Sequence, residues 1–446
     1  MQVRNCGVWQ RLPWSLARAS TRPLLHRTYA DAASRTIVLL PHEGIHNLHD
    51  AAPGTADFFT SKGNGLPLKF LRERCAAILE ANPWLAARVV SQPQLSLVVP
   101  EAPSAADHCA FYEETSTTEL GHTTLRKFFD AAQAPTPISA HGASLFSRRG
   151  VDCLDADEPL FKMRAVIAAD GKSLLLSTSM SHVLGDGATL YRVHGMLHPD
   201  ASVTVMSAER KQSFLAAMGR LEGAIPGTTL IPAATLHAPA FALSPSSVDK
   251  WAALHASGAC RSVEEGGLVA PLPPATGACN VYLDDGAIAQ AKTDAVAEGG
   301  VPFVSTNDVF TSWIFLAHRA DLAVMAYNTR SLLGAEAQHL AGNYQVSLAF
   351  SPGEFSPASI RRAVALPGIK SEGVARGVPG PSQRTVLVTS WAQGHTQLEL
   401  DGVTHDLHQP FVPAAARGAV SPFHAKAKSM PRQNPCHAKK KTYKIL

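Results

Sequence analysis

Two apolar runs joined by a tight turn constrain the fold of this chain more than any other stretch. The runs are residues 161–169 and 172–180, and the dipeptide between them is Asp170-Gly171. Asp-Gly between two such runs is a strong signal for a β-hairpin, because both residues accept the positive φ that a tight turn needs. His182 follows the second run, so we expect its side chain at the exit of a buried strand.

The segment after the hairpin reads SHVLGDG and carries His182, Asp186 and Gly187. Apolar residues at helical spacing follow it, so we predict a strand, a turn that carries the histidine, and a helix from about residue 188. A bare His-x-x-x-Asp pattern should occur about once by chance in a chain of this composition. Residues 46–50 supply a second match, to which we give no catalytic weight because it lacks this context.

Preceded by Thr178-Ser179-Met180, the motif resembles the active-site motif of the coenzyme-A-dependent acyltransferase superfamily. That superfamily includes the plant and fungal BAHD acyltransferases, chloramphenicol acetyltransferase and peptide-synthetase condensation domains. The resemblance implies an α/β fold with two chloramphenicol-acetyltransferase-like lobes. Each lobe would be a mixed β-sheet flanked by helices, with an active-site tunnel between the lobes.

The same resemblance implies an acyltransferase that moves an acyl group from an acyl-CoA thioester to a hydroxyl or amine of a small-molecule acceptor. His182 would be the general base, and no covalent intermediate would form. Asp186 and Gly187 would shape the loop that carries the histidine. We expect no metal and no cofactor, with acyl-CoA as co-substrate.

Further matches to the family recur in order along the chain. Ser305 and Asp308 form a capping-box pattern that begins a helix, and the stretch resembles the family's S-x-N-D-x-x-x-x-W helix. Arg330 follows an expected strand and is our candidate partner for Asp186, because paired hydrogen bonds from arginine orient a carboxylate strongly. A Gly-Asn pair follows at Asn343. The resemblance implies substrate-binding roles for Asn307, Asp308 and Asn343.

A last match lies at Thr389-Ser390-Trp391, which resembles the triplet before the family's second signature, D-F-G-W-G. The resemblance implies catalytic roles for Trp391, through its indole N–H, and for Ser390 near the tetrahedral intermediate. In place of the second signature the chain has only Leu400-Asp401-Gly402-Val403, without the aromatic residues. This departure places the chain outside the plant BAHD enzymes proper.

Three other functions remain open on the sequence. The weak second signature favours, as the main alternative, a non-catalytic binding or scaffold protein with a condensation-type fold. Metal binding by His182 and Asp186 is a weaker alternative, because no further ligand with suitable spacing lies nearby in the sequence. A hydrolase is the third, but the chain has no G-x-S-x-G motif.

Composition shifts divide the chain into five segments. Residues 1–30 hold five arginines and no acid, and residues 407–446 hold eight basic residues and no acid, so 31–406 is acidic, with 27 basic and 36 acidic residues. We expect a transit peptide or disordered segment at 1–35, an N-terminal acyltransferase lobe at 36–221, a crossover linker at 222–275, a C-terminal lobe at 276–414 and a basic disordered tail at 415–446.

These shifts also bear on partners and location. Because the basic residues lie at the ends, the sequence does not predict nucleic-acid binding by the folded body. No apolar run is long enough for a transmembrane segment, and seven scattered cysteines without C-x-x-C favour a reducing compartment. We expect a monomer. The arginine-rich N-terminus predicts a mitochondrial location, with a plastid or the cytoplasm as alternatives.

Overall fold

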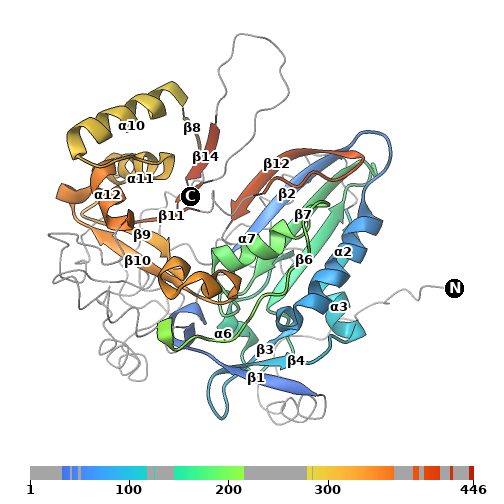
Figure 1. Cartoon of the computed structure of the whole chain (residues 1–446). Helices are drawn as coiled ribbons and strands as arrows, with labels where there is room; N and C mark the ends of the chain where they lie inside the picture. Colours follow the sequence, from blue (N-terminus) through green and yellow to red (C-terminus); the bar gives the residue numbers. More distant parts are fainter. Residues whose placement is uncertain are drawn as a thin grey trace, which may run out of the picture.

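The computed structural model describes residues 33–40, 43–48, 52–117, 125, 145–214, 279–283, 285–365, 385–390, 396–411, 422–424 and 441–445. Within these residues the strands form three sheets, of five, six and three strands, and helices flank the two larger ones (Figure 1). The protein is therefore a mixed α/β structure with two main sheets, as the sequence predicts.

The five-stranded sheet carries the predicted hairpin. Its order is β12-β2-β7-β6-β5, and all neighbouring pairs are antiparallel except β5 with β6. The hairpin turn contains Gly171 at φ +65°, the left-handed region that glycine adopts without strain. The strands are β2 (Gly54–Ser61), β5 (Tyr112–Ser116), β6 (Phe161–Ile167), β7 (Ser173–Met180) and β12 (Val403–Phe411).

Two helices, α2 (Leu68–Ala81) and α7 (Gly187–Gly195), pack on one face of this sheet. Leu71 and Ile78 of α2 share a hydrophobic core with Leu190 of α7 and with Leu174 and Leu176 of β7. Helix α2 ends where the sequence predicts, at the Asn82-Pro83 step, because proline cannot continue a helix. This packing fixes α7, and with it the turn that carries His182, against the sheet.

Strand β12 lies within the expected C-terminal lobe, 276–414, but belongs to the sheet of the N-terminal half. It pairs along its length with β2, as the adjacent red-orange and blue strands in Figure 1 show. Hydrophobic pattern identifies a strand but not its partner, and Phe411 of β12 packs against Phe146 of the N-terminal half.

The six-stranded sheet belongs to the C-terminal half, with the order β10-β9-β11-β13-β14-β8. Helices α11 and α12 cover it through a core that includes Phe310, Ile314, Met325 and Ile360. The elements are β8 (Cys279–Leu283), α10 (Asp285–Gly299), α11 (Thr306–Ala317), β9 (Leu322–Asn328), β10 (Gln345–Phe350), α12 (Pro357–Ala365), β11 (Thr385–Ser390), β13 (Pro422–His424) and β14 (Lys441–Ile445).

Strands β13 and β14 correct the expectation of a wholly disordered tail from residue 415. β13 pairs with β11, and β14 pairs with both β13 and β8. Backbone hydrogen bonds to strands already in place can hold a basic segment that has too few apolar residues to form a core by itself. The rest of the tail, the expected linker at 222–275 and residues 1–32 lie outside the described residues.

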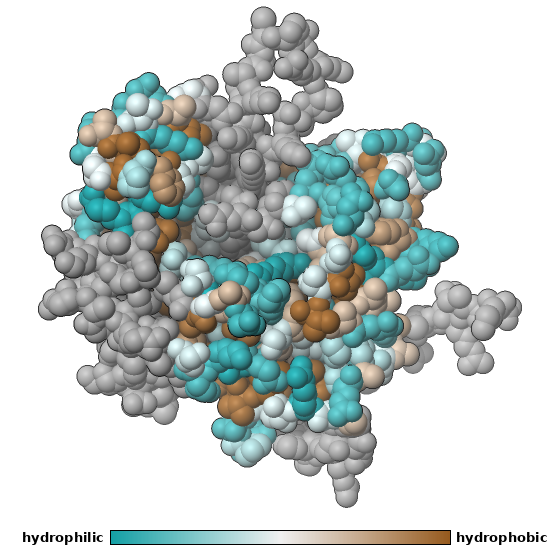
Figure 2. Space-filling model, viewed as in Figure 1, coloured by the Kyte–Doolittle hydropathy of each residue, from teal (hydrophilic) through white to brown (hydrophobic). Residues whose placement is uncertain are grey.

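The remaining described elements are short. The three-stranded sheet has the order β1-β4-β3 and starts at Ser34, within the segment 1–35 that we expected to be a transit peptide or disordered. No helix in the described ranges is long and apolar enough to cross a membrane. On the face seen in Figure 2, hydrophobic residues form small separate patches among hydrophilic ones.

The short elements that complete the described structure are β1 (Ser34–Val38), β3 (Arg88–Val90), β4 (Ser96–Pro100), α3 (Ala105–Phe111), α6 (Gly150–Cys153), the π-helix η1 (Glu43–Asn47) and 3₁₀ helices η2 (Pro83–Ala86), η5 (Arg330–Leu333), η6 (Ala335–His339) and η7 (Pro352–Glu354).

Candidate active site

Asp186 ends the turn after β7 and begins helix α7. Its Oδ1 accepts hydrogen bonds from the backbone N–H of Thr189 at 2.9 Å and from the Thr189 hydroxyl at 3.0 Å. A carboxylate at this N-cap position satisfies a free N–H of the first turn and interacts favourably with the positive end of the helix. The helix begins at Gly187, one residue before the predicted position.

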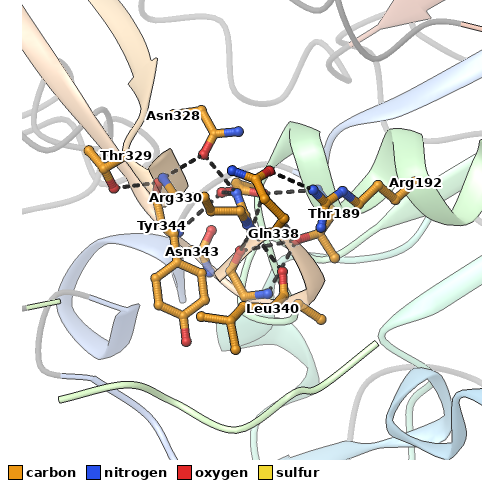
Figure 3. Close-up of polar contacts among 12 residues, drawn as sticks. Thr189, Arg192, Asn328, Thr329, Arg330, Gln338, Leu340, Asn343 and Tyr344 are labelled. Atoms are coloured by element: carbon orange, nitrogen blue, oxygen red, sulfur yellow. Dashed lines mark hydrogen bonds and ion pairs between the residues drawn. The ribbon is translucent and has the colours of Figure 1, made fainter. Parts of the chain in front are cut away.

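Arg330, at the start of η5 after β9, pairs with Asp186 as expected from the sequence. Its Nη1 lies 2.8 Å from Asp186 Oδ2, and its Nη2 lies 3.1 Å from Oδ1, which makes a two-point ion pair. Arg330 is fully buried, and it also donates to the Leu340 and Gly342 carbonyls and to the Thr189 hydroxyl (Figure 3). The arginine thus joins the C-terminal half to the loop that follows the hairpin.

This pairing controls the ionisation of Asp186. Burial alone would raise the pKa of the carboxyl, but the charge and hydrogen bonds of Arg330 and the N–H groups of Thr189 and Tyr344 lower it below its usual value. Because the folded-state pKa is depressed, the stabilisation from Asp186 is complete above the unfolded pKa of about 3.9 and is lost only as the pH falls through the folded value. The carboxylate is therefore charged at neutral pH.

A glycine allows the loop before β10 to approach this pair. Gly342 has φ +135°, and a Cβ at this position would lie 2.9 Å from Nη1 of Arg210. Its carbonyl accepts from the Asp186 N–H at 3.2 Å and from Arg330. A larger residue would meet both backbone strain and a clash, so the Gly-Asn pair depends on glycine here.

The imidazole of His182 is partly exposed, and two asparagines contact it. Its Nδ1 lies 3.1 Å from Asn343 Oδ1 and 2.9 Å from Asn47 Nδ2. The orientation of the Asn343 amide is fixed, because Nδ2 donates to the His182 carbonyl at 2.7 Å and to Glu43 at 3.0 Å. Asn343 Oδ1 therefore faces Nδ1 as an acceptor, which favours the ring hydrogen on Nδ1 and a lone pair on Nε2, whereas Asn47 Nδ2 faces the same nitrogen as a donor.

Glu43 holds the Asn343 side chain in place through hydrogen bonds. The carboxylate is fully buried in η1, and Oε1 accepts from the side chain and the backbone N–H of Asn343. Oε2 accepts from Arg210 Nε at 2.9 Å and from the Leu40 N–H at 3.0 Å. Arg210 also donates to the carbonyls of Val183 and Leu184 in the histidine loop. Hydrogen bonds thus form a continuous network that runs from Arg210 through Glu43 and Asn343 to His182.

A cavity of about 270 Å³ opens at the start of α7. Its lining combines residues from both halves of the chain and includes Ser390 at the end of β11, but not His182. The lining residues are Asp186, Gly187, Ala188, Tyr191, Arg192, Ala326, Asn328, Gln345, Thr389 and Ser390. A polar cavity between two parts of the chain is a typical place for a small ligand.

The expected substrate-binding residues have different surroundings. Asn343 lies at His182, where it positions the ring. Asp308 forms the capping box of α11 with Ser305 and pairs with Arg361, and its side chain is 1% exposed, so the structure gives it a structural role. Helix capping and the ion pair use Oδ2, and the substrate contact of Asp308 stays a prediction. Asn307 lies in the same first turn, and Trp391 lies outside the described residues.

Sequence reasoning missed Glu43, Asn47 and Arg210. Asn47 lies within the second His-x-x-x-Asp match at 46–50, yet it contacts the other histidine, His182, and Glu43 contacts Asn343 beside that histidine. No local pattern connects residues so far apart in the chain. The structure identifies Glu43 as a buried acid that is paired with Arg210 and Asn343.

Comparisons with known proteins address the fold. No family model matches the chain, and no curated protein matches it in sequence. Among solved structures, F. graminearum TRI101 complexed with coenzyme A and deoxynivalenol matches with a TM-score of 0.56 and 14% identity, over 92% of this chain and 94% of that one. The condensation domain of the monacolin K polyketide synthase MokA matches with a TM-score of 0.50 and 10% identity, over 93% and 92%. The chain has the fold of these proteins.

A further TRI101 complex, with coenzyme A and T-2 mycotoxin, agrees with this result at a TM-score of 0.54 and 16% identity, over 92% of this chain and 94% of that one. The matches span nearly the whole length of both chains, so the likeness is not limited to one lobe. The predicted fold class is confirmed: two sheets flanked by helices, in the arrangement of TRI101 and a condensation domain.

Proposed function

We propose that this protein transfers an acyl group from an acyl-CoA thioester to a hydroxyl or amine of a small-molecule acceptor, with His182 as general base. The observation that carries the proposal is the contact of Asn343 Oδ1 with Nδ1 of His182, which favours a ring hydrogen on Nδ1 and a lone pair on Nε2. A neutral imidazole in this tautomer can accept a proton. The shared fold with TRI101, a protein solved with coenzyme A and a mycotoxin, supports the same reaction class.

In the proposed reaction, Nε2 of His182 takes the proton of the acceptor as its oxygen or nitrogen attacks the thioester carbonyl carbon. A tetrahedral intermediate forms, and its collapse breaks the carbon–sulfur bond. His182 then gives the proton to the CoA sulfur. The acyl group passes directly between the substrates, so the protein is never acylated, and the imidazole returns to its starting state.

The negative oxygen of the intermediate requires a hydrogen-bond donor. Ser390 lines the cavity beside Asp186 and Gly187, and its hydroxyl is our candidate, with the indole N–H of Trp391 as the second. The hydrogen bond from a preorganised donor strengthens as negative charge develops on the oxygen. This lowers the barrier to acyl transfer. Asp186 and Arg330 take no proton in this scheme and hold the histidine loop. Asn307 is retained as a candidate substrate contact.

The proposal is tested by incubating the purified protein with a panel of acyl-CoAs and with hydroxyl and amine acceptors. Release of free CoA thiol that depends on the acceptor is the expected result. Calorimetry with the same acyl-CoAs measures binding separately. Acyl-CoA binding without thiol release would favour the non-catalytic binding or scaffold function, and neither binding nor release would contradict the proposal altogether.

Replacing Asn343 with alanine should reduce kcat by about fivefold, because an orienting hydrogen bond worth ~1 kcal/mol is lost at the His182 ring. The KM for acyl-CoA should change little, since Asn343 is buried behind the ring. Steady-state kinetics measure both constants. Asn64→Ala, at an exposed loop residue, is the matched control. A raised KM at unchanged kcat would show that Asn343 binds substrate instead.

Residues 1–35 are proposed to direct the protein to mitochondria, because five arginines and no acid occur in the first 30 residues. A fusion of residues 1–35 to a fluorescent protein should therefore colocalise with a mitochondrial stain. Replacing the arginines at 4, 11 and 18 with glutamine should abolish the localisation. A diffuse signal from the unmodified fusion would rule out the transit peptide. A plastid signal would favour a plastid location instead of a mitochondrial one.

A further inference from the structure

A second buried polar cluster lies under α7 and takes no part in the proposed reaction. It consists of Asp57 on β2, His194 on α7 and His408 on β12. Asp57 and His194 are 0% exposed and His408 is 8% exposed. One potential ligand atom from each residue lies within 4.8 Å of the others. Three elements distant in sequence therefore place metal-binding side chains at one buried point.

A bulge in β12 adds another histidine to this point. His408 pairs with Asp57 across the sheet and His405 pairs with Phe59, with a register shift between His405 and Leu407. The shift leaves one extra residue in β12, so residues three apart face the same side. His405 Nε2 lies 2.9 Å from Asp57 Oδ1, and the His405 ring stacks on Phe59.

His194 and His408 each point one ring nitrogen at Asp57 and the other at a hydroxyl. His408 has Nδ1 2.7 Å from Asp57 Oδ1 and Nε2 2.8 Å from the Tyr191 hydroxyl. His194 has Nε2 3.4 Å from Asp57 Oδ2 and Nδ1 3.4 Å from the Thr55 hydroxyl. Histidines that bind metal ions have this pattern, in which a hydrogen bond to the outer nitrogen orients the ring.

Part of the cluster has no hydrogen-bond partner. Among the described residues, the buried atoms Asp57 Oδ2, His194 Nε2 and His405 Nε2 make no hydrogen bond of acceptable geometry. A buried carboxylate oxygen without a donor is costly, and a cation among these atoms would satisfy all three.

We propose that Asp57, His194 and His408 bind a divalent transition-metal ion. Two imidazoles and one carboxylate suit Zn²⁺, which takes nitrogen and oxygen ligands in a tetrahedron. The potential ligand atoms of these three residues lie within 4.8 Å of one another, and ring nitrogens of His408 and His194 lie 2.7 and 3.4 Å from the Asp57 carboxylate. His405, on β12, contacts the same carboxylate at 2.9 Å.

Such an ion would join β2, β12 and α7. Helix α7 starts at Asp186, and Tyr191 on the same helix lines the cavity and bonds His408. The ion would hold the edge strand β12 and the helix below the histidine loop in one place. The proposal departs from the sequence-based expectation of no metal, and it does not depend on the acyl-transfer reaction.

The test uses the full chain without a histidine tag, stripped with a chelator, reloaded with Zn²⁺ and freed of excess ion. Elemental analysis should find one zinc per chain, and thermal unfolding should shift upward on loading. His194→Gln and His408→Gln should each lower zinc affinity at least tenfold in a chelator competition. His318→Gln, at an exposed histidine of the other half, should bind zinc like the unmodified protein.

Co²⁺ loading of the unmodified chain supplies a readout that does not depend on the variants folding. A tetrahedral visible spectrum without a thiolate charge-transfer band is expected. A chain that retains no metal after loading would overturn the proposal. Asp57 would then share protons with the histidines alone. Equal zinc binding by all variants, or a thiolate band, would also overturn it, because the ion would lie elsewhere.

Discussion

Replacing His182 with alanine is expected to slow acyl transfer by about 100- to 10,000-fold, the usual contribution of a positioned acid–base group. The slower rate corresponds to a reaction barrier that is ~3–5 kcal/mol higher. Affinity for acyl-CoA should stay nearly unchanged, because no binding group is removed apart from the ring. Steady-state rates and calorimetry measure the two effects separately.

His339→Ala is the matched control, because His339 is an exposed histidine at the end of η6. It should keep the full rate. Thermal unfolding of both variants must match that of the unmodified protein for the comparison to hold. A His182→Ala protein that transfers acyl groups at the unmodified rate would show that another group performs the proton transfer.

The second large effect is on stability. Arg330→Met should reduce the free energy of unfolding by about 3–5 kcal/mol, because the charged Asp186 carboxylate is left buried without its partner. Arg72→Ala is the control: Arg72 makes a similar two-point contact with Glu114, but its side chain is 62% exposed. An exposed pair contributes about 0–1 kcal/mol. Chemical denaturation measures both changes.

Two further measurements separate the loss of the ion pair from a loss of packing. Asp186→Asn combined with Arg330→Met should be less destabilised than Arg330→Met alone, because asparagine keeps the N-cap and carries no charge. In Arg330→Met, burial should raise the pKa of Asp186, so the loss of stability should shrink as the pH falls from 7 toward 4.5. A loss that is the same at every pH would show that packing by the arginine side chain dominates.

The sequence predicted the elements whose signals are local. The hairpin with Asp170-Gly171 and the capped start of α11 depend on residues a few positions apart, and both are present in the structure. The pairing of Arg330 with Asp186 is long-range, and its prediction came from the family resemblance. For Asp308 the structure shows the helix cap and an ion pair with Arg361, and the substrate contact that the resemblance implies stays a prediction.

Long-range partners could not be predicted from pattern. Glu43 and His182 meet through Asn343, and nothing in the sequence near Glu43 indicates a buried acid. The pairing of β12 with β2 and the bulge that turns His405 and His408 to one side were missed for the same reason. Alternating polarity identifies a strand, but an inserted residue changes which side chains share a face.

Single-turnover acyl transfer followed by intact-mass spectrometry tests the role of His182 most directly. Protein in excess over the most reactive acyl-CoA of the panel is mixed with acceptor and quenched over time. Direct transfer predicts that acylated acceptor and free CoA appear together in equal amounts, that protein mass stays constant, and that His182→Ala slows both products alike. An acylated protein, or CoA release at the same rate in His182→Ala, would contradict the account.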